Sequence, residues 1–324
     1  MDTILSGMQP TGQLHLGNYE GALKNWANLQ DSYNMFLCIV DWHALTAEYD
    51  KTADLKENVF QMAVDFLAGG LDPDKCAIFI QSEVKEHAEL HLLLSMLTTV
   101  PTLTRLPTYI EKKEQKGLDS YGFLGYPVLQ AADILLYNAH KVPVGKDQEK
   151  HIWLASDLAK RFNNTYGKTF NEPSVLLTKF PTILGSDNRK MSKSLNNHIA
   201  IEDTEEETEK KLKRFFTDPT KVRKNDPGHP EECPVYLLHQ IYTGGHEDIV
   251  APCKSGELGC VDCKKRLTKN LNETVAPIRE KRKKLVEKPD YVIDVLKEGA
   301  RKARVRASAV MEKVRENMKM VYYK

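Results

Sequence analysis

Short apolar runs alternate with longer amphipathic segments over about the first 80 residues of the chain. The apolar runs predict buried strands at residues 3–8, 35–41 and 77–81. The amphipathic segments predict helices at residues 17–30 and 55–68. Strands and helices that alternate at this spacing are typical of an α/β fold with a doubly wound parallel sheet, in which ligands bind beyond the carboxyl ends of the strands. Residues 7–18 and 41–46 are therefore candidates for a binding site.

The remainder of the chain has a mostly helical pattern. Residues 90–162 show helical spacing, interrupted by a strand-like segment at 141–144. Beyond residue 197 the chain becomes more charged, and its last helix is predicted to bury one apolar stripe, with members at steps of three and four. The stripe consists of Leu296, Ala300, Ala303, Ala307, Val310, Val314, Met318 and Val321. The pattern thus predicts a second, helical part that begins at residue 198.

The composition changes this picture only through the distribution of charge. The chain has 324 residues, 46 Lys and Arg, 45 Asp and Glu and 41% hydrophobic residues, which excludes fibrous, disordered and disulfide-scaffold proteins. Residues 264–324 carry 19 basic and 8 acidic side chains, a net charge of +11, so the preceding residues carry −10. The formal net charge of +1 is therefore a cancellation, and it does not exclude a nucleic-acid partner.

The chain shows no membrane or export signal, and we expect a cytoplasmic protein. Met1 is followed by Asp2, and the most apolar run, residues 90–100, contains His91 and ends at Pro101. Six cysteines are too few for a disulfide scaffold. In a reducing compartment, clustered thiols are more often metal ligands or catalytic groups.

Two segments have the chemistry of a phosphate site, although the chain contains neither GxxxxGK[ST] nor GxGxxG. After the first predicted strand, Pro10 and Gly12 form a turn, and His15, Gly17 and Asn18 begin a helix whose free N–H groups attract anions. Gly17 lets a ligand approach the backbone, although an ordinary strand-to-helix turn would have the same pattern. The second segment, residues 190–194 (KMSKS), has two lysines suited to a polyphosphate, or to a solvated basic loop.

Together the two segments resemble the two signatures of class I aminoacyl-tRNA synthetases. The similarity extends through residues 122–137, 142–152 and 158–163 to the C-terminal helices, and over essentially the whole chain it is to the bacterial-type tryptophanyl-tRNA synthetases. The resemblance implies a Rossmann-like catalytic domain at 1–197, with a mostly helical insertion at about 100–140 that forms a dimer interface. It also implies a helical anticodon-binding domain at 198–324.

The resemblance also assigns roles to matching positions. For tryptophan it implies Asp133, which would accept the indole N–H, with Tyr126, Gln148 and His43. For ATP with Mg²⁺ it implies Gln9, Pro10, Thr11, Gly17, Asn18, Gly145, Lys146, Asp147, Ile183, Lys190, Met191, Ser192, Lys193 and Ser194. The catalytic residues implied are His15, Lys190, Lys193 and Ser194. The chain departs from many relatives at two positions. They have an acidic residue at Lys146, and a lysine at Ile110 that Lys112 or Lys113 would have to replace.

Four cysteines fall within 31 residues, at Cys233, Cys253, Cys260 and Cys263. Four thiolates suffice for a tetrahedral zinc ion or an iron–sulfur cluster, and His229, His239 or His246 is near enough in sequence to replace one of them in a zinc site. Free thiols or disulfides are the alternative. The spacing resembles a subset of tryptophanyl-tRNA synthetases with a [4Fe-4S] cluster, which makes that cluster the first choice and zinc the second.

The remaining expectations concern partners and rival functions. The resemblance implies tRNA(Trp), L-tryptophan and ATP as ligands, and a homodimer. Ten basic residues between positions 264 and 288 are expected to contact tRNA phosphates. The nearest alternative is a tyrosyl-tRNA synthetase; others are a synthetase-like paralogue that binds nucleic acid without aminoacylation, and a small-molecule nucleotidylyltransferase.

Overall fold

The computed structural model describes the chain except for residues 146–147, 178–181, 219 and 324. The described residues form two compact units. The first consists of Met1–Gly12, Asn25–Lys179 and Lys288–Lys324, and the second of Gln13–Lys24 and Phe180–Glu287. Neither unit is one continuous stretch, and the division does not coincide with a single boundary at residue 197.

The first unit is built on a five-stranded sheet. Its strands are β1 (Thr3–Met8), β2 (Asn34–Ile39), β3 (Cys76–Ile80), β4 (Lys141–Val144) and β5 (Ser174–Leu177). They pair in the order β3-β2-β1-β4-β5, and every pair is parallel. The predicted doubly wound parallel sheet is therefore confirmed, with β5 as a strand that the pattern did not reveal. Its direction of growth reverses at β1, so the carboxyl ends of β1 and β4 flank the point where such sheets bind ligands.

Helices cover both faces of this sheet. In order along the chain they are α2 (Lys24–Leu29), α3 (Asp41–Glu48), α4 (Leu55–Ala68), the 3₁₀ turn η2 (Gln81–Glu83), α5 (Glu86–Ser95), α6 (Val100–Thr104), α7 (Pro107–Lys116), α8 (Tyr121–Leu136), α9 (Glu149–Tyr166) and α14 (Pro289–Asn317). The register places Leu5, Phe36 and Ala77 on one face, where they join the core formed with α5, α8, α9 and α14. On the other side Trp26 of α2 packs edge-on against Phe66 of α4. Strand alternation thus supplies an apolar surface to each helix layer.

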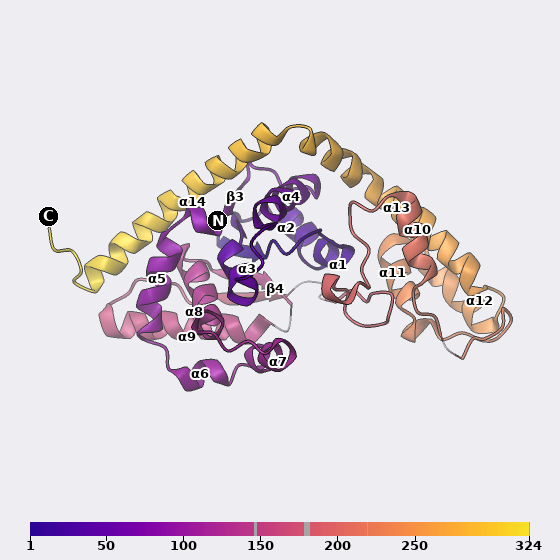
Figure 1. The fold of residues 1–324 in the computed structure, drawn as a ribbon, viewed down its shortest axis with the longest axis horizontal. Helices are drawn as coiled ribbons and strands as arrows, with labels where there is room; N and C mark the ends of the chain where they lie inside the picture. The colour runs from indigo at the N-terminus through magenta and orange to yellow at the C-terminus, as the bar shows by residue number, and fades with distance from the viewer. Residues whose placement is uncertain (146–147, 178–181, 219, 324) are drawn as a thin grey trace. The chain divides into compact units, whose positions relative to one another are not determined.

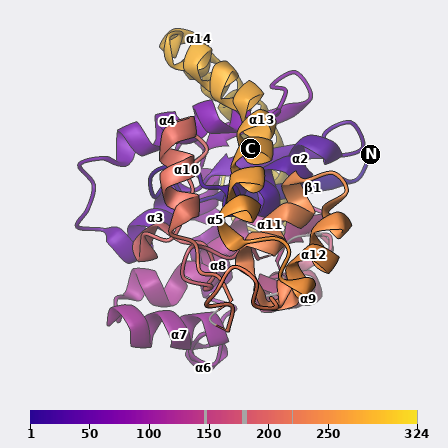
Figure 2. The same ribbon diagram turned by 90° about the vertical axis from the view of Figure 1, so that its right-hand side faces the viewer.

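The long C-terminal helix packs on the edge strand of the sheet. Figures 1 and 2 show α14 as an extended helix, and its Ala300, Ala303 and Ala307 are in the same core as Phe79 of β3. The approach is close at Gly299, where a Cβ atom would lie 1.8 Å from the carbonyl oxygen of Ile78. The predicted stripe is buried from Leu296 to Val314. The prediction that Val321 belongs to it was wrong, because the helix ends at Asn317 and Val321 is 45% exposed.

The second unit is mainly helical. Its elements are α1 (Leu16–Asn18), the π-helical turn η1 (Tyr19–Leu23), η4 (Lys193–Leu195), α10 (Glu205–Lys213), η5 (Pro230–Glu232), α11 (Pro234–Tyr242), η6 (His246–Ile249), α12 (Val250–Ser255) and α13 (Cys260–Val286). Thr204 and Glu207 form a capping box at the start of α10, whose first turn is acidic. Helices α10 and α11 pack on α13 around buried Leu267, Leu271 and Val275.

Candidate active site

His15 is held by the backbone of the helix that it begins. The N–H of Asn18 donates to His15 Nδ1, and the N–H of His15 donates to Asn18 Oδ1, both at 3.3 Å. Because Nδ1 is an acceptor in this reciprocal cap, the proton of the neutral imidazole is on Nε2. The first signature therefore presents a fixed N–H donor at a helix start.

The imidazole of His15 is also kept neutral. Burial, followed by the nearby charges of Lys193, His198 and Lys190, lowers the pKa of His15 to about 3. Lys190 and Lys193 are the two lysines expected to bind a polyphosphate. His15 thus contributes a neutral hydrogen-bond donor between fixed positive charges.

The two signatures, more than 170 residues apart in sequence, meet in the second unit. Leu16 N–H donates to the carbonyl of Ile199 at 3.0 Å, and Ile201 N–H donates to that of Leu14 at 2.9 Å. A Cβ atom on Gly17 would lie 2.9 Å from His15 Nδ1 and 3.5 Å from Met191 Cβ. The space beside Gly17 where a side chain would lie is therefore taken by the imidazole and the KMSKS segment.

The KMSKS segment is anchored by Asn197, which is 2% exposed. Asn197 Oδ1 accepts the N–H of Ser192 at 2.7 Å, and its Nδ2 donates to the carbonyl of Lys190 at 3.2 Å and to Asp187 Oδ1 at 2.6 Å. The hydroxyls of Ser192 and Ser194 are 3.0 Å apart. One buried amide thus fixes the backbone between the two lysines.

The other expected ATP residues are divided between the units. Gln9, Pro10 and Thr11 follow β1 and Gly145 follows β4, on the two strands where the sheet changes direction. Ile183 is in the second unit, and its carbonyl accepts the N–H of Met191 at 2.8 Å. Lys146 and Asp147 lie outside the described residues. The structure therefore places the expected set in two groups, one at the sheet edge and one around His15.

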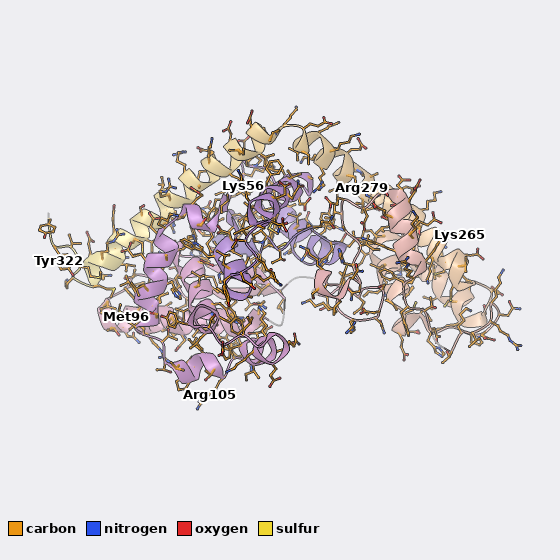
Figure 3. All side chains as sticks on the ribbon, in the orientation of Figure 1. Lys56, Met96, Arg105, Lys265, Arg279 and Tyr322 are labelled. Carbon is orange, nitrogen blue, oxygen red and sulfur yellow. The ribbon has the colours of Figure 1, made fainter. Side chains whose placement is uncertain are left out.

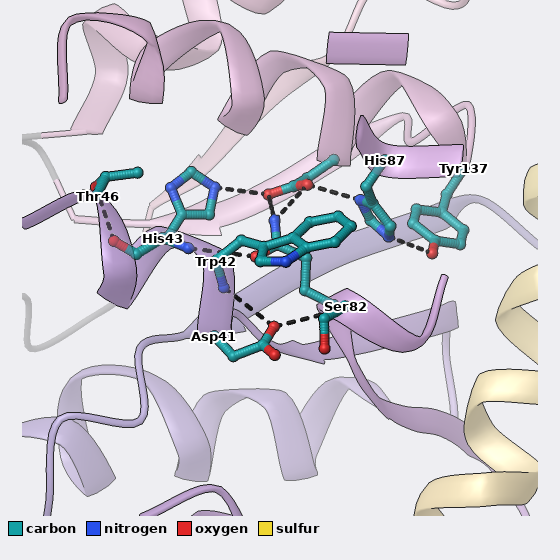
Figure 4. A network of polar contacts seen from close by, with 9 residues as sticks. Asp41, Trp42, His43, Thr46, Ser82, His87 and Tyr137 are labelled. Carbon is teal, nitrogen blue, oxygen red and sulfur yellow. Dashed lines mark hydrogen bonds and ion pairs between the residues drawn. The ribbon is translucent and has the colours of Figure 1, made fainter. Parts of the chain in front are cut away.

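A polar network surrounds Asp133 in the first unit (Figure 4). Asp133 is in α8 and is 3% exposed. Its Oδ2 accepts from His43 Nε2 at 2.8 Å, its Oδ1 accepts from His87 Nδ1 at 2.6 Å, and Gln81 Nε2 lies 2.8 and 3.0 Å from the two oxygens. Three side chains thus hold this buried acid, and of these only His43 was among the residues expected at the tryptophan site.

The network keeps Asp133 ionised. Burial raises the pKa of its carboxyl, but the charge of His87 and the hydrogen bonds from both histidines lower it further, and the pKa of Asp133 falls well below the ordinary range. An ionised carboxylate in an apolar helix can act only as an acceptor of hydrogen bonds. It is suited to recognising a ligand N–H group.

Tyr126, about two turns before Asp133 in α8, belongs to a separate group. Its hydroxyl is 2.9 Å from Thr108 Oγ1 and 3.2 Å from His151 Nε2. Lys112 Nζ lies 5.0 Å from the centre of its ring. Of the two lysines considered as replacements at Ile110, Lys112 is therefore the one beside Tyr126, while Lys113 lies over Tyr109. Gln148 is at the N-cap position of α9, where its side chain makes no capping hydrogen bond.

The four clustered cysteines line one cavity in the second unit, at the start of α13. Burial and the nearby Cys233, Cys253 and Cys260 raise the pKa of the Cys263 thiol to about 12. His229 lines the same cavity, and His239 Nε2 is 3.4 Å from Cys263 Sγ. No group of three or more His, Cys, Asp or Glu in the described part of the chain has the arrangement of a metal-ligand set. The structure thus gives four converging thiols without a coordination geometry.

Three of the ten basic residues expected to contact RNA are half-buried and bind other parts of the described chain. Arg279 donates to Asn272 Oδ1 at 2.8 Å and to Thr208 Oγ1 at 2.9 Å, which joins α13 to α10. Arg282 pairs with Glu202 at 2.5 Å, and Lys264 donates to the carbonyl of Phe215 at 2.7 Å. The exposed members are Lys265, Arg266, Lys269, Lys281, Lys283, Lys284 and Lys288.

Gln81, His87, Tyr137 and Asn197 have places in these sites that the pattern did not reveal. Gln81 had a usable signal, because it directly follows the third strand and the carboxyl ends of parallel strands meet at one sheet edge. His87 had none, since a single histidine in an apolar helix is usually a core residue.

The parallel sheet, the helix start at His15 and the adjoining lysine loop are the parts of a class I synthetase. The family model described as "tRNA synthetases class I (W and Y)" matches residues 2–276. The tryptophan–tRNA ligase of Thermotoga maritima is 49% identical over 98% of this chain and 99% of its own, and that of Aquifex aeolicus is 42% identical over 98% and 99%. The chain therefore belongs to the tryptophanyl-tRNA synthetases of this class I family.

Solved structures agree with this assignment. The tryptophanyl-tRNA synthetase of Campylobacter jejuni, crystallised with ADP and tryptophan, is 36% identical, with a TM-score of 0.87 over 98% of this chain and 99% of that one. A tyrosyl-tRNA synthetase of Archaeoglobus fulgidus, 23% identical with a TM-score of 0.69, shares the fold. No helix in the described ranges is long and apolar enough to cross a membrane.

Proposed function

We propose that the protein activates L-tryptophan with ATP to form tryptophanyl-adenylate and then transfers the tryptophanyl group to tRNA(Trp). The observation that carries the proposal is the meeting of the two signature segments around His15, in a chain that matches tryptophan–tRNA ligases over nearly its full length. A paralogue without activity would not need to keep this donor and both lysines together.

Asp133 accounts for the choice of tryptophan. Its buried carboxylate would accept the indole N–H, with His43 beside it, while Tyr126 and Gln148 would hold the ammonium and carboxylate groups. A site with a buried acceptor rejects phenylalanine by a factor of about 10⁴ or more, because the acceptor would lose its partner. Tyrosine is harder to exclude, since its hydroxyl also donates.

The two groups of ATP residues would bind different parts of the nucleotide. Gln9, Pro10, Thr11 and Gly145 would line the nucleoside side at the sheet edge, and we assign Lys146, Asp147 and the backbone of Ile183 to ribose and adenine by resemblance alone. His15, Gly17, Asn18 and residues 190–194 would bind the phosphates with Mg²⁺. The support for the second group is its neutral imidazole donor and its two lysines around one helix start.

In this mechanism the tryptophan carboxylate attacks the α-phosphorus, the bond to the bridging oxygen breaks, and pyrophosphate leaves with both of the bond's electrons. In the second step a ribose hydroxyl of the tRNA attacks the carbonyl carbon of the adenylate, and AMP leaves. No protein nucleophile is needed. The chain's contribution is positioning, with charge stabilisation by His15 Nε2–H, Lys190, Lys193 and Ser194.

The test is ATP–pyrophosphate exchange with tryptophan or tyrosine as the amino acid. We expect exchange that depends on tryptophan and is at least 100-fold weaker in kcat/KM with tyrosine. Exchange with tyrosine alone would establish the tyrosyl enzyme instead. Absence of exchange with either amino acid, from a folded sample, would favour a paralogue that does not aminoacylate.

We further propose that residues 198–324 form the anticodon-binding part and that the exposed basic residues of α13 contact tRNA phosphates. The support for both is the net charge of +11 over residues 264–324 and the exposure of six basic side chains on α13, with Lys288 just beyond its end. Aminoacylation should weaken with salt while exchange changes much less. Lys265→Glu (Lys265 is labelled in Figure 3) should raise the KM for tRNA several-fold. Lys297→Glu on α14 is the matched control, and an equal effect of both would contradict the assignment.

For the cysteine cavity we propose a [4Fe-4S] cluster, with zinc as the second choice. Four sulfur donors line one cavity, and four thiolates are the correct donor set for an iron–sulfur cluster or a zinc ion. Burial raises the pKa of Cys233, Cys253 and Cys263, and the bound metal would keep their thiols ionised. When bound, the group would supply a cross-link between the start of α13 and the segments of Cys233 and Cys253. Anaerobic purification with iron, sulfide and zinc analysis tests this. A sample with neither metal, and no visible absorbance, would remove both choices.

A homodimer in the cytoplasm is the remaining proposal. It is supported by exposed Leu92, Met96, Val100 and Trp153 on α5, α6 and α9, which adjoin the insertion at 100–140 (Met96 is labelled in Figure 3). The cytoplasm is where translation uses charged tRNA. Light scattering should give a dimer mass, and Trp153→Lys should weaken the dimer. A monomeric wild-type protein at micromolar concentration would contradict the proposal.

A further inference from the structure

The carboxylate of Asp133 already has a full set of hydrogen bonds. Oδ1 accepts from His87 Nδ1 and Gln81 Nε2, and Oδ2 accepts from His43 Nε2 and from the same amide nitrogen, all at 2.6–3.0 Å. A carboxylate offers about four acceptor positions. A ligand N–H can therefore reach Asp133 only if one of these donors moves away.

The two histidines are held differently. His87 is 0% exposed, and its ring is fixed at both ends, by Asp133 at Nδ1 and by the Tyr137 hydroxyl at Nε2, 2.8 Å away. His43 is 6% exposed, and within the described residues its ring has a hydrogen bond only through Nε2. Figure 4 shows His43 and His87 on opposite sides of the carboxylate, with Tyr137 behind His87. His43 is the donor that leaves at the lower cost.

Tyr137 holds the side of the His87 ring that faces away from Asp133. An ionised Asp133 cannot donate, so His87 Nδ1 carries a proton, and His87 Nε2 lies 2.8 Å from the Tyr137 hydroxyl oxygen. Tyr137 is 0% exposed, and burial raises the pKa of its hydroxyl well above the ordinary range, so the proton stays on the oxygen. The hydroxyl thus keeps the ring in the orientation in which Nδ1 faces the carboxylate.

We propose that His87 and Tyr137 are positioning residues that hold one oxygen of Asp133 in place, while the indole N–H of tryptophan replaces His43 on the other oxygen. This inference rests on the proposed role of Asp133 in tryptophan recognition. It separates a fixed part of the specificity site from an exchangeable part. Indole recognition then depends on a residue pair that does not touch the substrate.

The test compares kcat/KM for two substrates that differ in one hydrogen-bond donor. β-(3-Benzothienyl)alanine has sulfur in place of the indole N–H and nearly the same shape. The ratio of kcat/KM for tryptophan to that for this analogue, in ATP–pyrophosphate exchange, reports the bond to Asp133. We expect Tyr137→Phe to lower this ratio about fivefold to tenfold, as the loss of about one hydrogen bond implies, with the analogue's own kcat/KM changed less than twofold. A merely structural lesion would lower both substrates together.

Three further variants complete the experiment. His87→Asn keeps a donor near the position of Nδ1, so it should lower the ratio of the two kcat/KM values less than His87→Leu does. His43→Ala should keep or raise the ratio, because the donor that indole replaces is already absent. Tyr166→Phe, the same chemical change at a half-buried tyrosine near the end of α9, is the matched control and should leave the ratio unchanged.

The outcomes distinguish a failure of the positioning pair from a failure of tryptophan recognition by Asp133. If Asp133→Ala, which removes both acceptor oxygens, keeps the wild-type ratio, the role of Asp133 in tryptophan recognition is wrong. If Asp133→Ala lowers the ratio but Tyr137→Phe and His87→Leu leave it unchanged, only the positioning pair is overturned. A fall with His43→Ala as large as that with Tyr137→Phe would overturn the exchange of donors.

Discussion

Replacing Gly17 with alanine tests whether the helix start at His15 is built for catalysis. The new Cβ atom would lie 2.9 Å from His15 Nδ1 and 3.0 Å from its Cε1, closer than non-bonded carbon atoms normally approach. The imidazole is the neighbour that would have to move. Its movement would break the bond from the Asn18 N–H, which is 3.3 Å long in the native protein.

The expected effect on stability is moderate, because the helix preference of alanine offsets only part of the cost. Alanine in place of glycine favours a helix by up to about 1 kcal/mol. Loss of the side-chain cap costs about 1 kcal/mol, and crowding in a packed site costs about 1–3 kcal/mol. We therefore expect a net loss of about 1–3 kcal/mol in the free energy of unfolding.

The expected effect on catalysis is larger. A misplacement of about 1 Å in a positioned group costs about 10² in rate. Tryptophan-dependent ATP–pyrophosphate exchange should therefore fall about 100-fold in kcat for Gly17→Ala. Gly244→Ala is the control, because no atom lies within 4 Å of its new Cβ. Exchange by Gly17→Ala within twofold of wild type would refute the placement of His15 at the reacting phosphates.

Three further predictions concern the same enzyme. Lys193→Ala should lower the single-turnover rate of adenylate formation at least tenfold with little change in the dissociation constant for tryptophan, and an equal loss in both would contradict its role at pyrophosphate. Unfolded His15 (pKa 6.5) binds a proton at pH 5.5 but folded His15 (pKa about 3) does not, so stability falls as the pH drops through 6.5. Between pH 7.5 and 5.5, His15→Gln should lose about 1.4 kcal/mol less unfolding free energy than wild type, as urea denaturation would measure, and equal losses would disprove the lowered pKa. Gly299→Ala should destabilise the first unit by on the order of 3 kcal/mol in the same assay, because its Cβ would meet the carbonyl of Ile78, whereas Gly122→Ala, with its nearest neighbour at 4.0 Å, should not.

Local pattern predicted the elements of the sheet unit well. The strands at residues 3–8 and 77–81 and the helix at 55–68 lie within one residue of their observed positions. Their signal is the period of apolar side chains, which depends on residues a few positions apart. The short strand Ser174–Leu177 has no such signal, since its four residues are half-buried or exposed and it is defined by its pairing with β4.

The last helix shows where local pattern ends. Its apolar stripe was visible in the sequence, but the surface that the stripe covers was not. The structure packs it on β3, at Gly299 and Ile78, more than 200 residues away in sequence. Which two apolar surfaces pair depends on their shapes and on close approaches such as this glycine, and neither is encoded in hydrophobic spacing.

The sequence by itself determined the family and the doubly wound sheet, because signatures and hydrophobic periods are short-range features of the chain. Only the tertiary structure decided that His15 is neutral and that Asp133 is held by three donors. It also decided that Arg279 joins two helices rather than facing solvent. The physical reason is that ionisation and hydrogen bonding depend on burial and on atoms within a few ångströms, and folding brings those atoms from distant parts of the chain.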